Sequence, residues 1–125
     1  MDNQNKAEVF TRAAEALEKY GLIAGVWGDK TRGFCALGVI GYAVNGQSYE
    51  VEMEYLHPYI NALSEALNLQ PQADKYNMLS PDDHRLLEAN YKVAAWSNNL
   101  VAAGLQGEVI AGFRRAAAHY ETHLP

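Results

Sequence analysis

Apolar residues recur every three or four positions near both ends of the chain, which is the spacing of one face of a helix. Gly21 follows the first set as a helix stop signal, so a helix is predicted over residues 4–20. The second set predicts a final helix over residues 106–121. The recurring positions are Val9, Phe10, Ala13, Ala14, Leu17 and Tyr20 in the first set and Val109, Ile110, Phe113, Ala116, Ala117 and Tyr120 in the second.

The segment from Gly33 to Val44 is apolar on every side, which predicts a helix that is buried all round. Asn45-Gly46 then fits either a helix C-cap or a hairpin turn. Residues 49–55 alternate between apolar or aromatic side chains and glutamates, which favours a strand. Residues 39–44 do not alternate as a hairpin partner would, so we favour the cap and leave a short extended segment near residues 48–55 open.

Two further helices are predicted between these segments. Pro58 can open a helix at its first turn, and Leu56, Ile60, Leu63 and Leu67 share one face. Ser80-Pro81-Asp82-Asp83 is a strong helix start, and that helix ends near residues 96–99. Residues 21–32 are broken by glycines and predict a loop, with a polar turn over residues 29–33. The whole pattern predicts an all-α fold, a compact bundle of about five short helices in a single domain over residues 1–125.

Charge and cysteine usage narrow the class of protein. The formal net charge is −5, and the ten basic residues are scattered, which argues against a nucleic-acid-binding surface. One cysteine permits no internal disulfide and suggests a reducing compartment. The N-terminus is polar, and no apolar run approaches the ~20 residues that span a bilayer. We therefore expect a cytoplasmic protein that binds neither nucleic acid nor membrane.

Cys35 is the first candidate for chemistry, because it lies at the predicted start of the buried helix. A helix N-terminus stabilises a thiolate and lowers the pKa of a thiol. His57 or His84 could act as the base, and Asn98 or Asn99 could orient it, but no local signature ties these residues together. The alternative is that Cys35 packs as a small hydrophobic residue, which we favour.

Two histidines near the C-terminus are weak metal-ligand candidates. His119 and His123 lie four apart on a helix and could face one metal, but the intervening residues do not form a metalloprotease motif. Histidines at a helix C-terminus also complement the helix dipole without any metal. The acidic residues are explained by helix capping and by a solvated face, and no phosphate-binding loop is present. No metal and no cofactor are expected.

Aromatic residues are the remaining candidates for function. Trp27, Trp96, Tyr55 and Tyr59 are candidates for a binding surface, where tryptophan and tyrosine are enriched. These residue types are equally common at the margin of a hydrophobic core. For Trp96 we favour a position in the core, because its neighbours in the sequence are apolar.

Four segments together carry a family resemblance. The segments are residues 21–25, the Cys35-Ala36-Leu37-Gly38 segment with its flanks, residues 93–99, and Glu108-Val109-Ile110. With them the chain resembles a family of small uncharacterised domains from actinobacteria and their phages. Leu22 stands where that family usually has tryptophan, and Ser97 and Asn99 depart from its Trp-Asn-Asp segment. The resemblance implies a helical fold and a phage or prophage origin, and it implies no activity.

The sequence favours a non-enzymatic binding module over an enzyme, because no convincing catalytic set is present while aromatic residues are plentiful. The expected partner is a protein, and it would be a host protein if the chain is phage-encoded. A homodimer or larger homo-oligomer is also expected. The alternative is a cysteine-dependent hydrolase or transferase that uses Cys35.

Overall fold

The computed structural model describes residues 3–24, 28–45, 53–70 and 81–122, with the side chains of residues 3, 45, 53–55 and 81–87 left out. The described part is mostly helical, with five helices and one small two-strand hairpin, so the predicted helical class is confirmed. The elements are α1 (Asn3–Tyr20), β1 (Gly28–Asp29), β2 (Gly33–Phe34), α2 (Ala36–Asn45), α3 (Met53–Ala66), α4 (Pro81–Ala102) and α5 (Gln106–Thr122).

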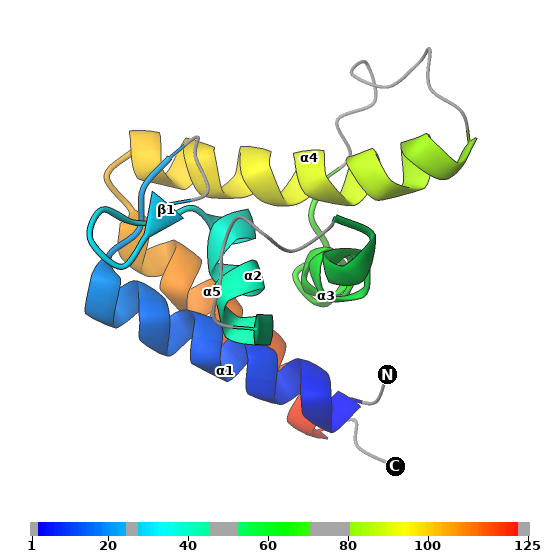
Figure 1. Cartoon of the computed structure of the whole chain (residues 1–125), viewed down its shortest axis with the longest axis horizontal. Helices are drawn as coiled ribbons and strands as arrows, with labels where there is room; N and C mark the ends of the chain where they lie inside the picture. Colours follow the sequence, from blue (N-terminus) through cyan, green and yellow to red (C-terminus); the bar gives the residue numbers. More distant parts are fainter. Residues whose placement is uncertain (1–2, 25–27, 46–52, 71–80, 123–125) are drawn as a thin grey trace.

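Helices α1 and α5, from the two ends of the chain, pack against each other along their lengths and run antiparallel. Arg114 of α5 pairs with Glu18 near the end of α1, while Lys6 near the start of α1 lies 5.1 Å from the ring centre of Tyr120. Helix α4 crosses the opposite side of the molecule, and α2 and α3 lie between it and the α1–α5 pair (Figure 1). The helices enclose one apolar core, to which all five contribute.

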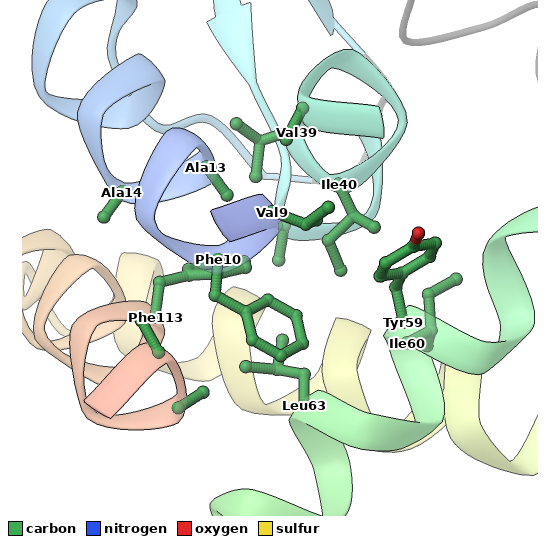
Figure 2. Close-up of a cluster of buried hydrophobic side chains, with 14 of the residues drawn as sticks. Val9, Phe10, Ala13, Ala14, Val39, Ile40, Tyr59, Ile60, Leu63 and Phe113 are labelled. Atoms are coloured by element: carbon green, nitrogen blue, oxygen red, sulfur yellow. The ribbon is translucent and has the colours of Figure 1, made fainter. Parts of the chain in front are cut away.

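Phe10 of α1 lies at the centre of this core and is fully buried. Its ring lies 6.3 Å from that of Phe113 and 5.9 Å from that of Tyr120, both on α5. Figure 2 shows side chains of α1, α2, α3 and α5 converging here, among them Ile40 and Leu63. Ten of the twelve residues predicted to face inward from the first and last helices are buried, whereas Tyr20 and Ile110 are half-buried at the edge of the core.

The hairpin connects α1 to α2 through hydrogen bonds that the sequence pattern does not show. Gly28 pairs with Phe34 and Asp29 with Gly33, in antiparallel register. The Phe34 N–H donates to the carbonyl of Gly21 at 3.0 Å, so the hairpin is tied to the end of α1. The predicted loop over residues 21–32 therefore contains part of a strand pair, and α2 begins at Ala36 rather than at Gly33.

Three helix boundaries differ from the predictions. Pro58 lies inside α3, an exposed position five residues after Met53, rather than in the first turn. Residues 53–55 belong to α3 and are not extended, because so short an alternation does not outweigh tertiary context; residues 48–52 lie outside the described part. Helix α4 continues past residues 96–99 to Ala102, since packing of Trp96 and Leu100 against the core outweighs the weak helix propensity of serine and asparagine.

No helix in the described part of the chain is both long enough and apolar enough to cross a membrane.

Candidate binding cleft

A surface cleft of about 490 Å³ lies between α1 and α2. We call it the α1–α2 cleft; it is lined by Arg12, Glu15, Ala16, Tyr20, Tyr42, Ala43 and Val44. Ala16 and Ala43 are only 5% and 4% exposed and form its floor, so the hollow exists because both helices carry a small side chain where they face each other. Its volume falls within the range of ligand-binding pockets.

Stacked aromatic rings form one end of the α1–α2 cleft. Tyr42 of α2 stacks on Phe34 of the hairpin with ring centres 4.9 Å apart. Tyr20, the last residue of α1, meets both rings edge-on at about 6 Å. Such pairs add to stability beyond the area they bury, so this wall is a fixed surface rather than a set of loose side chains.

Two lysines hold their ammonium groups over the outer tyrosines. Lys19 Nζ lies 5.2 Å from the ring centre of Tyr20, and Lys30 Nζ lies 5.5 Å from that of Tyr42. A hydrogen bond from Tyr42 lowers the pKa of Tyr20 below its ordinary value, and the hydrogen bond and charge of Lys19 and the charge of Lys30 act in the same direction. The aromatic end of the cleft therefore combines hydroxyl groups with positive charge.

Three basic residues in or beside this cleft have no carboxylate partner among the described residues. Arg12 lines the cleft, Lys19 and Lys30 lie over its two tyrosine rings, and none of the three forms an ion pair there. Elsewhere, Arg32 pairs with Asp29 and Lys92 with Glu88, as Arg114 does with Glu18. The positive charge at the cleft is therefore available to a ligand.

A second, smaller cleft of about 240 Å³ lies beside Trp96, where the end of α3 approaches α4. The indole of Trp96 packs against Phe113, at 6.1 Å between ring centres, and against the backbone of Gly112. A Cβ atom on Gly112 would lie 2.5 Å from Trp96 Cζ2, so glycine makes room for the ring. One side of Trp96 thus packs against α5, and the other side lines the smaller cleft together with Lys92.

Cys35 directly precedes α2 and acts as its N-cap. The Gly38 N–H donates to Cys35 Sγ at 3.3 Å, and the Val39 N–H donates to the Cys35 carbonyl at 2.9 Å. Burial raises the pKa of the Cys35 thiol, and the backbone N–H groups of the helix start only partly oppose it. The direction is the reverse of the one expected from the helix N-terminus alone, because desolvation of the thiolate is the larger effect.

The other candidates for a cysteine-based site form no hydrogen bond with Cys35 in the described part of the chain. No hydrogen bond links Cys35 to His57 on α3 or to Asn98 on α4. The side chain of His84 lies outside the described residues. Catalysis by Cys35 stays a prediction.

The remaining predicted site residues are spread over the molecule. Tyr59 is 6% exposed, and its hydroxyl accepts a hydrogen bond from Asn5 at 2.8 Å, so it packs between α3 and α1. Trp27, His123 and the side chain of Tyr55 lie outside the described residues. His119 lies on the exposed surface of α5, and no group of three or more metal-ligating side chains occurs in the part of the chain that the structure describes.

The residues of the α1–α2 cleft were not among the predicted site residues. Tyr20 had been assigned to the buried face of the first helix, and Tyr42 to a helix buried all round. The signal that could have found them is a tyrosine on each of two successive helices, because a tyrosine hydroxyl usually needs a hydrogen-bond partner. Only the fold shows that the two rings meet.

The structure defines a small, mostly helical protein with an open cleft at a hairpin-supported corner. The family of unknown function DUF6197 matches residues 1–119, and the chain belongs to this family. No curated protein and no solved structure matches the chain.

Proposed function

We propose that the protein is a non-enzymatic binding module and that the α1–α2 cleft is its contact surface for a partner protein. The observation that carries this proposal is the combination, in one cleft, of a preformed aromatic wall and basic side chains without carboxylate partners. Tyrosine, tryptophan and arginine are enriched among the residues that contribute most of the binding energy at protein interfaces.

The shape of the cleft favours a protein partner over a small metabolite. A small-molecule site usually surrounds its ligand and buries most of its surface. The α1–α2 cleft instead lies along the junction of two surface helices and is lined by exposed residues such as Arg12 and Glu15. A side chain or a short segment of a partner protein fits such an open surface.

A cleft-filling variant tests the proposal. Ala43→Leu places extra bulk on the cleft floor, whereas Ala103→Leu adds the same atoms at an exposed turn between α4 and α5. Wild-type protein and both variants are immobilised and exposed to a lysate of the source cells, and retained proteins are identified by mass spectrometry. One protein should be retained by the wild type and by Ala103→Leu and lost by Ala43→Leu, and the purified pair should then bind in solution.

Thermal melting of each variant separates loss of binding from loss of fold. A partner that binds Ala43→Leu as well as it binds the wild type, with the fold of the variant intact, contradicts the use of this cleft. If the chain is phage-encoded, as we also propose, the retained protein comes from the host.

We also propose that the protein forms a homodimer, which light scattering can test. In the described part of the chain Leu105 is the one large hydrophobic residue that is clearly exposed, at 49%. A stable dimer interface is commonly larger and more apolar than a single leucine. Any dimer that forms should therefore be weak and dissociate on dilution.

A further inference from the structure

We propose that the partner presents an acidic segment to the α1–α2 cleft and that one of its carboxylates binds at the Tyr20 hydroxyl, between Lys19 and Lys30. This inference rests on the proposed function and adds the chemistry of the segment that is recognised. It commits to a segment of a protein partner that carries a carboxylate side chain next to an apolar one.

The two tyrosines of the cleft carry hydroxyl groups that can donate a hydrogen bond to a ligand. Tyr20 and Tyr42 both line the cleft, with their ring centres 5.9 Å apart, and each phenolic hydroxyl has one proton to donate. A carboxylate is an acceptor that makes a strong hydrogen bond with such a hydroxyl.

Positive charge at this end of the cleft selects an anionic acceptor. The ammonium groups of Lys19 and Lys30 are each held over a tyrosine ring, so both are positioned before a ligand arrives. Neither forms an ion pair within the described residues. A carboxylate placed between them would be attracted by both and would gain two partners without breaking an existing pair.

The other residues of the cleft determine which partner side chain can bind next to the carboxylate. Its floor is apolar, formed by Ala16 and Ala43 with Val44 beside them, so a leucine-sized side chain fits there. Glu15 lines the same cleft and repels a second carboxylate placed next to it. The net charge of −5 on the whole chain acts weakly at this site, because charges farther away than the Debye length of ~8 Å at physiological salt are largely screened.

Fluorescence anisotropy with two labelled synthetic peptides tests the inference on the full chain. One peptide alternates glutamate with leucine, and the matched peptide carries glutamine in place of each glutamate. The glutamate peptide should bind about tenfold or more tightly than the glutamine peptide, because charge-assisted hydrogen bonds are lost in the latter. Its affinity should fall as salt is raised.

Substitutions at the cleft locate the binding. Tyr20→Phe removes the donating hydroxyl and keeps the ring, and it should weaken the glutamate peptide about tenfold. Lys19→Gln and Lys30→Gln should each weaken it about two- to fivefold. Lys6→Gln is the matched control, since Lys6 also lies over a tyrosine ring, that of Tyr120, but at the other end of α1; it should change nothing.

The inference is wrong if the two peptides bind equally well or if neither binds. It is also wrong if Lys6→Gln and Lys30→Gln weaken the binding of the glutamate peptide equally. None of these results removes the proposed function, which fails only if the cleft-filling variant retains its partner. Loss of that partner from Ala43→Leu together with no preference for glutamate would leave a binding cleft of different chemistry, and this inference would be wrong.

Discussion

The α1–α5 core and the hairpin corner are held together in different ways. In the core, Phe10, Phe113 and Tyr120 fill space between two long helices, and their contribution comes mainly from buried apolar area. We define the hairpin corner as residues 21–24 and 28–42; it depends on backbone hydrogen bonds, glycine conformations and ring stacking. The core thus provides stability, while the corner shapes one wall of the α1–α2 cleft.

The largest effect is expected in the core. Phe10→Ala removes a fully buried ring and leaves a cavity between α1, α3 and α5, so it should lower the free energy of unfolding by about 3–5 kcal/mol. Urea denaturation followed by circular dichroism measures the change. A loss below about 1 kcal/mol, the level of an ordinary surface substitution, would mean that Phe10 is not central to the core.

The next effect is expected in the hairpin corner. Gly33 has φ +97°, and a Cβ there would lie 2.7 Å from the carbonyl oxygen of Gly21. Gly21 has the same φ, but nothing lies within 4 Å of its Cβ position. Gly21→Ala should therefore lower the free energy of unfolding by about 1–2 kcal/mol, because of the backbone conformation alone. Gly33→Ala should lower it further, because its Cβ atom also meets the Gly21 carbonyl.

The pair of glycine variants also tests the link between the corner and the cleft. Gly33→Ala should displace Phe34 and with it the stacked Tyr42, which NMR spectra of the tyrosine rings can detect. If the two variants are equally stable and their ring signals are unchanged, the close approach of Gly33 to Gly21 does not fix the position of the hairpin.

The sequence predicted the core far better than it predicted the corner. Helices α1 and α5 carry apolar residues at regular spacing over about three turns each, and local periodicity of that length is strong evidence. The hairpin strands are two residues long each, and their pairing depends on a bond from Phe34 to Gly21, which no local pattern encodes. Long periodic elements could thus be located in advance, whereas short paired ones could not.

The candidate cleft was unpredictable for the same physical reason. Ala16 and Ala43 look like ordinary small core positions, and only the crossing of α1 and α2 turns them into the floor of a hollow. Cys35 was predicted at the start of the helix, and the structure places it directly before the first helical residue. The helix N-terminus and burial shift the pKa of its thiol in opposite directions, and which effect is larger depends on the tertiary fold.

A smaller effect is expected where Trp96 meets α5. Gly112→Ala should lower stability by about 1–3 kcal/mol, because the new methyl group overlaps the indole and the ring must move. Gly107 lies on the same helix with nothing within 4 Å of its Cβ position, so Gly107→Ala should instead stabilise the protein by about 0.5–1 kcal/mol. Opposite signs in thermal or urea unfolding are the expected result, and a stabilising Gly112→Ala would show that Trp96 does not pack there.

The smallest effect is expected at the exposed turn of the hairpin. The Arg32 N–H donates to the Asp29 carboxylate at 2.8 Å and is the largest cause that lowers the pKa of Asp29; the Thr31 N–H, at 2.9 Å, also contributes. The pKa of Asp29 is lower in the folded state than in the unfolded state. The carboxylate therefore stabilises the turn fully at pH values above the unfolded pKa, and this stabilisation is lost as the pH falls through the folded pKa.

An NMR titration can follow this turn directly. The amide signals of Thr31 and Arg32 should shift with a midpoint below the ordinary pKa of aspartate, and Asp29→Asn should abolish that titration while barely changing global stability. A midpoint at or above the ordinary value would show that these hydrogen bonds do not form in solution.

Cys35 offers a separate test of the catalytic alternative. Because burial raises the pKa of its thiol, the folded protein should react with a thiol reagent at neutral pH more slowly than the same protein in urea. A faster reaction in the folded state would favour the cysteine-dependent hydrolase or transferase.

The central claim is that the protein meets its partner through the α1–α2 cleft, and site-specific photo-crosslinking in source cells tests it most directly. A photoreactive phenylalanine derivative is placed at Glu15, which lines the cleft, and in a second variant at Leu105, the exposed hydrophobic residue away from it. We expect one defined adduct from position 15 and none from position 105. An adduct that forms at position 105 and not at position 15 would contradict the claim.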